Sequence, residues 1–473
     1  MRPHRPARTT FLSVACLTAC LWPAALHSAA AGAHEAPTST AAHHLREVDR
    51  GQIATTFYNP IMDQNADPWM TQYDGSYYLT ATTGDNVTIW RSSAITNIAA
   101  GVQSIVWSPS GKEANFTDIW SPEIHHFGDH FYIYFAADQN SNNALHRDYV
   151  LISRADNPMG PYRFVGEVHD PANQWMIDPN IFSVRGHLYF LWSGWRNDQN
   201  QVQRLFIAPM SSPTQIDGPG VVISSPTYPW ETSVAPINEG PVTLQHDGKT
   251  FIVYSANASW KNAYCLGLLT LVGDNPLRPD DWRKTAHPVF LSQNGVYGPG
   301  RASFVTSENG KQDWMIYHAA RVNGSGWDRT IRAQPFTWNK NGTPHFGAPI
   351  PLDQAIPLPA GEVPNRVTFN PERTTTEAVT FDVTVPRAGT YGMYVRYKNA
   401  TGNTTTQNLI VNGQPQLPLS IPVSGSATRR NQDSTLEIDI TLPRGASTIQ
   451  IDTGPLGASV PFIQLTTTSV APY

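Results

Sequence analysis

One arrangement recurs five times along the chain and constrains its fold more than any other feature. Each copy has a charged residue, an apolar run, a turn signal such as Asp-Gly or Asn-Gly, and a second run rich in aromatic residues. Such dipeptides supply the positive φ angles of a tight loop, so each copy predicts a β-hairpin. The charged residues are Asp67, Glu123, Asp178, Glu239 and Arg301, which are spaced 55 to 62 positions apart.

Five similar units of this length predict the blades of a β-propeller, which we place at residues 53–352. The innermost strand of each blade lines the axis, so the charged residues that open the units are expected to face one central site. A Pro-rich linker follows at 353–368, and short alternating strands predict a β-sandwich at 369–473. The predicted fold is all-β, a five-bladed β-propeller followed by a C-terminal β-sandwich, without a long helix.

The N-terminal segment has the pattern of a targeting signal. Residues 1–33 combine three arginines, an apolar stretch and a final run of small residues, which is typical of a secretory signal peptide. A polar leader follows at 34–52. The sequence before Cys20 resembles a bacterial lipoprotein box, so a lipid anchor at Cys20 is the alternative to full secretion. No other stretch has the roughly 20 apolar residues of a membrane span.

Composition excludes some classes of partner. The formal net charge is −5 and the aromatic content is 11%, a balance that argues against nucleic acid as a partner. Cys265 is the one cysteine outside the predicted signal peptide, so no internal disulfide is expected. We predict that Cys265 is a small residue of the core.

Three of the five charged residues, Asp67, Asp178 and Glu239, are acids that open units one, three and four. Acids that converge on one axis either hold a cation or perform acid–base chemistry on a neutral ligand. Crowded like charges raise at least one pKa and leave a protonated acid beside an ionised base. Hydrolysis of a glycosidic bond requires this division of roles.

Tryptophans accompany these acids, and their rings suit the apolar faces of sugars. For strand tryptophans such as Trp192 we favour the other interpretation, that they fill the gaps between blades. Asp67 and Asp178 each precede a proline, so either one alone would indicate a turn, but three acids in register across repeats favour a function. The tryptophans are Trp69, Trp120, Trp192, Trp195, Trp260 and Trp327.

Seven short motifs contain or accompany these residues. In chain order they are Asp67-Pro68-Trp69, Trp120-Ser121-Pro122-Glu123, Ile177-Asp178, Asn238-Glu239-Gly240-Pro241, Tyr264-Cys265-Leu266-Gly267, Tyr297-Gly298-Pro299-Gly300 and Tyr317-His318-Ala319. These motifs resemble glycoside hydrolase family 43, and most closely its extracellular α-L-arabinofuranosidases. The resemblance implies an inverting mechanism that needs no cofactor. It implies that Asp67 is the general base, Glu239 the general acid, and Asp178 the residue that raises the pKa of the acid and orients it.

Family members often carry a histidine at Arg301 that helps to hold an axial calcium ion. A guanidinium repels a metal and only donates hydrogen bonds, so we assign no metal ligand. We expect the charge of Arg301 to replace the ion by pairing with an acid near the axis; the alternative is that Arg301 points into solvent. Of Arg329 and Arg332, one is expected at the pocket and the other in a structural ion pair. The candidate substrate-binding residues are Trp69, Trp120, Glu123, His318, Arg301 and Arg329.

The C-terminal region is similar to carbohydrate-binding modules of families 6 and 35 around Ala388-Gly389-Thr390-Tyr391 and Val411-Asn412-Gly413. Sugar binding needs exposed rings, and most rings here have the spacing of a strand core. Sugar binding and a packing role therefore both stay open. The candidate rings are Tyr391, Tyr394, Tyr397 and Phe462.

Together these features predict a secreted glycoside hydrolase that removes terminal arabinofuranose from arabinan or arabinoxylan of plant cell walls. A β-xylosidase and an endo-arabinanase are alternatives with the same fold. A non-catalytic propeller lectin is the alternative from another class, although a lectin has no need of the three acids.

Overall fold

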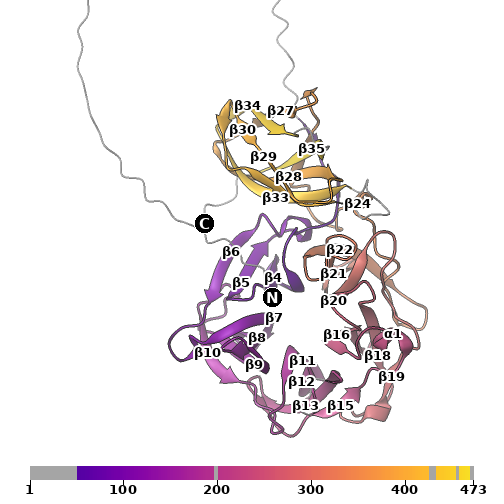
Figure 1. Ribbon diagram of the computed structural model, residues 1–473. Coiled ribbons are helices and arrows are strands. Elements are labelled where there is room, and N and C mark those ends of the chain that lie inside the picture. Colours follow the sequence, from indigo (N-terminus) through magenta and orange to yellow (C-terminus); the bar gives the residue numbers. More distant parts are fainter. Residues whose placement is uncertain (1–50, 197–200, 425–432, 454–457, 469–473) are drawn as a thin grey trace, which may run out of the picture. The chain divides into compact units, whose positions relative to one another are not determined.

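The computed structural model describes residues 51–196, 201–424, 433–453 and 458–468. The predicted signal peptide, Cys20 and nearly all of the predicted leader lie outside the described residues. Within them, the one α-helix, α1 (Pro229–Thr232), has four residues. Figure 1 shows a ring of sheets, coloured from indigo to orange along the chain, and a second group of strands in yellow. The three short 3-10 helices are η1 (Ile95–Asn97), η2 (Gly111–Glu113) and η3 (Pro279–Asp281).

Five antiparallel sheets form the ring, and each contains strands that follow one another in the sequence. The third sheet has an additional strand, β15, which pairs with β13. The predicted all-β propeller fold is confirmed. The first two sheets are β3 (Ala66–Tyr73), β4 (Ser76–Thr82), β5 (Val87–Ser92), β6 (Val102–Trp107), and β7 (Phe116–Phe127), β8 (His130–Gln139), β9 (Asn142–Ser153), β10 (Tyr162–Glu167). The third is β11 (Met176–Val184), β12 (His187–Gly194), β13 (Arg204–Ser212), β14 (Gln215–Ile216), β15 (Val221–Ser224). The last two are β16 (Asn238–His246), β17 (Lys249–Ala256), β18 (Cys265–Leu271), β19 (Trp282–Lys284), and β20 (Tyr297–Thr306), β21 (Asp313–Ala320), β22 (Arg329–Trp338), β23 (Pro344–His345).

The segment before the first sheet closes the ring against the last sheet. The Asn59 side chain donates to Ala333 O and accepts from Ala333 N–H, both at 2.9 Å. Met62 forms an isolated antiparallel β-bridge with Ile331 of β22. In addition, β2 (Thr56–Phe57) pairs with β24 (Ile356–Pro357), which follows the last sheet. Residues far apart in the sequence therefore hold the first and fifth sheets together.

An irregularity recurs in the innermost strand of every sheet. The register with the second strand shifts, as in a β-bulge, next to a residue that precedes a proline. These residues have left-handed φ values of 50° to 61°. A bulge bends the strand and changes the direction of its side chains. The five residues are Asp67, Ser121, Asp178, Gly240 and Gly298.

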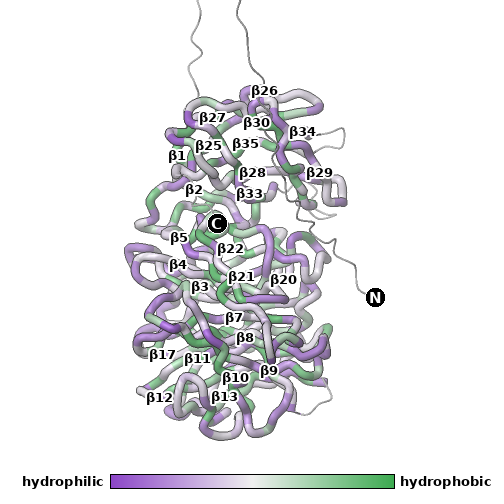
Figure 2. The backbone as a smooth tube through the Cα atoms, turned by 90° about the vertical axis from the view of Figure 1, so that its left-hand side faces the viewer, coloured by the Kyte–Doolittle hydropathy of each residue, from purple (hydrophilic) through white to green (hydrophobic). Residues whose placement is uncertain are grey.

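Apolar side chains pack between neighbouring sheets in five clusters, one for each junction of the ring. Trp192 is 3% exposed and belongs to the cluster between the second and third sheets, so its predicted packing role is confirmed. Cys265 is buried in the cluster between the third and fourth sheets, and burial raises its pKa to about 12. Figure 2 shows the hydrophobic residues in short stretches along the strands. No helix in the described part of the chain is long and apolar enough to cross a membrane.

The C-terminal domain consists of two five-stranded sheets and a two-stranded sheet. Tyr391, Tyr394 and Tyr397 are at most 2% exposed, so these rings pack in the domain and offer no platform to a sugar. One sheet includes β1, which crosses the predicted end of the leader, and β25, which crosses the predicted end of the linker. The strands are β1 (Gln52–Ile53), β25 (Arg366–Phe369), β26 (Arg373–Thr374), β27 (Ala378–Val385), β28 (Gly389–Asn399), β29 (Thr405–Gln407), β30 (Leu409–Val411), β31 (Gln414–Pro415), β32 (Leu419–Ile421), β33 (Ser434–Leu442), β34 (Gly445–Asp452) and β35 (Ala458–Thr466).

Candidate active site

The bulged ends of the innermost strands bring two of the predicted acids into one chain of hydrogen bonds. Asp67 Oδ2 accepts from the Thr82 hydroxyl at 2.6 Å, and Thr82 Oγ1 accepts from Ser121 N–H at 2.8 Å. The Ser121 hydroxyl donates to Asp178 Oδ1 at 2.5 Å, and Gly240 N–H donates to Asp178 Oδ2 at 2.9 Å. The first four sheets are therefore linked at their inner edges, next to Glu239.

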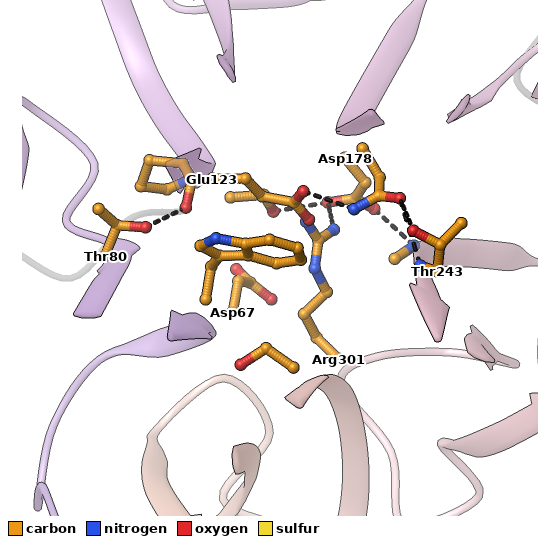
Figure 3. A network of polar contacts seen from close by, with 12 residues as sticks. Asp67, Thr80, Glu123, Asp178, Thr243 and Arg301 are labelled. Atoms are coloured by element: carbon orange, nitrogen blue, oxygen red, sulfur yellow. Dashed lines mark hydrogen bonds and ion pairs between the residues drawn. The ribbon is translucent and has the colours of Figure 1, made fainter. Parts of the chain in front are cut away.

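Arg301 of the fifth sheet lies between two carboxylates (Figure 3). Its Nη2 donates to Glu123 Oε1 at 2.6 Å, and its Nη1 forms an ion pair with Asp178 Oδ1 at 2.8 Å. Burial lowers the pKa of Arg301, but the charges of Asp178 and Glu123 outweigh burial and raise it. Arg301 is 1% exposed. The predicted pairing with an acid near the axis is confirmed, and the alternative that Arg301 points into solvent is wrong.

Glu123, the partner of Arg301, is fully buried. Its Oε2 accepts from Asn180 Nδ2 at 2.7 Å and lies 3.0 Å from His125 Nε2. Asn180 in turn accepts from the Thr243 hydroxyl at 3.0 Å, which joins the second, third and fourth sheets (Figure 3). Glu123 has no exposed surface. Both Glu123 and Arg301 are covered and pair with each other, and their contact with a substrate stays a prediction.

Glu239 is held by two neutral donors. The Tyr264 hydroxyl donates to Glu239 Oε1 at 2.8 Å, and Gln203 Nε2 donates to Glu239 Oε2 at 3.0 Å. Burial, followed by the charge of Asp178, raises the pKa of Glu239 to about 7. Glu239 thus carries a proton over a wide range of pH in which an ordinary glutamate is ionised.

Asp67 is partly accessible, with 18% of its side chain exposed. Its N–H donates to His318 Nδ1 at 2.9 Å, so this nitrogen carries no proton. Burial, assisted by Arg329 and Arg301, lowers the pKa of His318 far below its usual value and keeps the ring neutral. His318 is buried and positions Asp67 through this bond, and its contact with a substrate stays a prediction.

Arg329, another predicted substrate-binding residue, lies near Asp67. Its Nη1 is 3.8 Å from Asp67 Oδ1, and its Nη2 donates to Ser259 O at 2.8 Å. Burial raises the pKa of Asp67, and the charge of Arg329 opposes this rise. Arg332 is buried and donates to Ala320 O at 3.0 Å. Of the two arginines, Arg329 lies at the acids, as expected of one of them, whereas Arg332 donates to a backbone carbonyl and to the Thr330 hydroxyl.

The two remaining candidates for substrate binding are partly buried tryptophans. Trp69 Nε1 donates to Ile124 O at 2.8 Å, and its ring centre lies 4.6 Å from that of His125. The Trp120 ring stacks on His146 at 4.1 Å. Their contact with a substrate stays a prediction.

The residues around Arg301 do not fit an axial calcium ion. Calcium needs oxygen ligands, but a guanidinium, which only donates, already occupies the space between Glu123 and Asp178. Within the described residues, no three His, Cys, Asp or Glu side chains are grouped in a way that would hold a metal.

Gln203 and Ser121 hold acids of the site and are not among the predicted site residues. Gln203 carries no motif, yet its main chain pairs with Ile237 and its side chain reaches Glu239. Ser121 lies within a motif, two residues before Glu123, and its hydroxyl donates to Asp178. Its position before Pro122 was the available signal, since the same position holds Asp67 and Asp178 in other units.

Comparisons with known proteins agree with this geometry. The family described as glycosyl hydrolases family 43 matches residues 57–344. The chain is 36% identical over 310 residues to an extracellular exo-α-(1→5)-L-arabinofuranosidase of Streptomyces avermitilis, an alignment that covers 63% of this chain and 64% of the relative. It is 31% identical over 366 residues to α-L-arabinofuranosidase 43 of Humicola insolens, covering 74% of this chain and 71% of the relative. The chain thus spans slightly less than two thirds of the length of the Streptomyces relative.

Solved structures show the same architecture. An α-L-arabinofuranosidase from Lactobacillus brevis is 30% identical, with a TM-score of 0.59, and the match covers 63% of this chain and 98% of that one. An exo-β-1,3-galactanase from Phanerochaete chrysosporium is 14% identical with a TM-score of 0.50, covers 88% of this chain and 99% of its own, and shows a shared fold alone. Because the family match extends over more than half of its length, the chain belongs to glycosyl hydrolase family 43.

Proposed function

We propose that the protein is a secreted, inverting α-L-arabinofuranosidase that removes terminal arabinofuranose from arabinan or arabinoxylan. The names of two relatives support the sugar, and the extracellular description of one, together with the signal pattern of residues 1–33, supports secretion. One observation carries the hydrolytic proposal. Glu239, with a pKa raised to about 7, belongs to the same centre as Asp67, whose side chain is partly exposed.

In this proposal Glu239 donates its proton to the glycosidic oxygen as the bond from that oxygen to the anomeric carbon breaks. Asp67 accepts a proton from the water molecule that forms the new bond on the opposite face of the sugar. Inversion requires room for this water, and hence carboxyl groups roughly 6.5–9.5 Å apart. Asp178 accepts from Gly240 N–H, so it positions the strand beside Glu239, and its charge favours the protonated form of Glu239.

A panel of nitrophenyl glycosides tests the sugar. We expect release of nitrophenol from the α-L-arabinofuranoside to exceed release from the β-xyloside and the β-galactoside. Proton NMR of the product then tests inversion, because the first arabinose to appear has the β configuration. Preferred cleavage of the xyloside contradicts the sugar assignment, and binding of arabinan without cleavage of any substrate indicates a lectin.

Removal of either acid tests the assigned roles. Glu239→Gln and Asp67→Asn each remove one proton-transfer step, and general acid–base catalysis contributes roughly 100- to 10,000-fold. We therefore expect kcat to fall at least about 100-fold in each variant. Asp247→Asn, in the hairpin turn after the strand of Glu239, is the matched control and keeps wild-type activity. Near-normal turnover in a folded Glu239→Gln or Asp67→Asn variant contradicts the assignment of that residue.

A further inference from the structure

Two exposed tryptophans lie on the face of the ring that carries the acids. Trp260 is 39% exposed and Trp327 is 68% exposed, whereas the other large hydrophobic side chains exposed to this degree in the described residues are aliphatic. The loop of Trp260 follows β17, whose last residue pairs with Asn238, next to Glu239. The loop of Trp327 follows β21, whose last residue pairs with the first residue of β20.

The two rings form one unit that is connected to the acids. Their centres are 5.9 Å apart and their planes meet at 70°. Trp327 Nε1 donates to Ser259 Oγ at 3.1 Å, while Ser259 O accepts from Arg329 Nη2 at 2.8 Å. Arg329 Nη1 lies 3.8 Å from Asp67 Oδ1. A single residue, Ser259, therefore connects the exposed rings to an arginine that contacts Asp67.

Hydrogen bonds hold the two loops in place. Asn262 Nδ2 donates to Asn323 Oδ1 at 2.5 Å, which joins the loop of Trp260 to the loop of Trp327. Arg321 Nε donates to both oxygens of Asp328, at 2.9 and 3.1 Å, and closes the second loop at its base. The rings are thus held before a ligand arrives, which lowers the entropic cost of binding.

We propose that Trp260 and Trp327 form a platform for the sugar residues on the leaving-group side of the cleaved bond, in a neutral pentose chain such as arabinan. This inference rests on the proposed function. An enzyme that removes terminal sugars encloses the terminal residue among the acids, so the rest of the chain extends outward on the leaving-group side. The loop of Trp260 ends at Tyr264, which donates to Glu239, the residue that protonates the leaving oxygen. Exposed indole rings provide apolar area for the face of a sugar ring.

Kinetics with substrates of different length test the platform. Trp327→Ala is compared with the wild type on α-1,5-arabinotetraose and on methyl α-L-arabinofuranoside, which has no sugar on the leaving side. We expect kcat/KM on the tetraose to fall about ten-fold, mainly through KM, and to fall more than on the methyl glycoside. Trp327→Phe keeps a ring but loses the N–H, and retains most of the preference for the tetraose. The same preference in Trp327→Ala as in the wild type overturns the proposal, as does a Trp327→Phe variant that behaves like Trp327→Ala.

Val272→Ala is the matched control, because Val272 is 49% exposed and follows β18 at the opposite end of the same sheet. We expect Val272→Ala to have the wild-type kcat/KM on both substrates.

Binding measurements separate this proposal from the proposed hydrolysis. Calorimetric titration of Glu239→Gln with arabinotetraose is repeated with Trp327→Ala added, and the dissociation constant is expected to rise about ten-fold. If the wild type releases no arabinose, the proposed function fails, but this loss of affinity still supports the platform. Absent or unchanged binding overturns the platform. Sedimentation that shows a dimer of this chain dissociating on Trp327→Ala also overturns it, because a second copy then covers the rings.

Discussion

At the scale of single residues, Glu239 shows how neutral groups position an acid without removing its proton. Hydrogen bonds to a carboxylate favour the charged form, and burial favours the neutral form. Around Glu239 the donors are a phenol and an amide, Tyr264 and Gln203, and burial is the larger influence on its pKa. After the proton leaves, the same two donors stabilise the new carboxylate. They therefore serve the acid both before and after proton transfer.

Gln203→Met tests this role, because it removes the donor while keeping a side chain of similar length. Loss of the donor raises the pKa of Glu239, so the fall in activity above about pH 7 is expected to move to higher pH. Gln203→Glu, which adds a negative charge beside Glu239, moves it further in the same direction. The pH dependence of kcat/KM measures both shifts. Gln245→Met, a change near the far end of the strand of Glu239, is the control.

A shift of this alkaline limb to lower pH in Gln203→Met would show that the amide does not stabilise the Glu239 carboxylate. An unchanged limb with a lower kcat would assign Gln203 to positioning alone.

Sequence patterns predicted the acids of the site but not their supports. Asp67, Asp178 and Glu239 are charged residues in a recurring position, so their convergence follows from the repeat. Sequence alone does not show how deeply a charged residue is buried, and the pairing of Glu123 with Arg301 could therefore not be predicted from the motifs. Gln203 reaches Glu239 through a parallel bridge between separate segments, for which no local pattern exists.

At the scale of the strand, the bulge next to a proline directs the charged side chains to the centre. A left-handed φ is unfavourable for residues other than glycine, and such strain is found at functional sites. Asp67, Ser121 and Asp178 accept this conformation, with φ of 50° to 61°. The hairpins could be predicted from turn dipeptides and alternation. The bulges could not, because alternation predicts a regular strand and the charged residues occupy different positions relative to the proline.

Gly240→Ala tests whether the bulge positions the charge network. Gly240 has a φ of 55°, and an added Cβ would lie 2.9 Å from Arg301 Cδ and 3.2 Å from Ser255 Oγ. Arg301 must then move away from its carboxylate partners. We expect kcat to fall roughly 100-fold, as for an ångström-scale displacement of catalytic groups, and the protein to lose about 1–3 kcal/mol of stability.

Gly248→Ala is the matched control for this substitution, since Gly248 has a φ of 72° and open space around its Cβ position. It shares the backbone strain without the clash. Kinetic assays and thermal unfolding of both variants separate the two effects, and equal activity in the two variants would contradict the role of the bulge.

At the scale of the whole molecule, carboxyl groups that lose contact with water on folding dominate the response to pH. Seven of them in the described residues have a raised pKa, with burial as the first cause, and Glu231 is lowered instead by hydrogen bonds from Lys284 and neighbouring backbone, which outweigh burial. Neither the net charge nor the repeat pattern predicts that more carboxyl pKa values are raised than lowered, because each shift depends on how far folding removes that acid from water. The seven are Asp63, Asp67, Asp148, Glu239, Glu362, Glu437 and Asp439.

The sign of the pH effect on stability follows from proton linkage. A carboxyl with a raised pKa in the folded state holds its proton there while the unfolded chain has lost it. Its contribution to stability is therefore fully present below the unfolded pKa and is lost as pH rises through the folded pKa, which is about 6 for Asp63, about 7 for Glu239 and about 8 for Glu437. The buried histidines His146 and His318 have lowered pKa values, so they remove stability as pH falls below that of a free histidine.

We therefore expect the melting temperature to be highest in mildly acidic solution and to fall steadily from pH 6 to pH 9. Asp148→Asn tests one group that contributes to this fall in melting temperature, since both Asp148 oxygens are buried without a hydrogen-bond partner among the described residues. The amide has nearly the same shape and does not ionise, so this variant is more stable than the wild type at pH 9 and less sensitive to pH. Asp247→Asn, at a surface turn, shows the wild-type slope. Calorimetric melting across this range measures the slopes, and a melting temperature that rises toward pH 9 would show that these carboxyl groups are ionised in the folded protein.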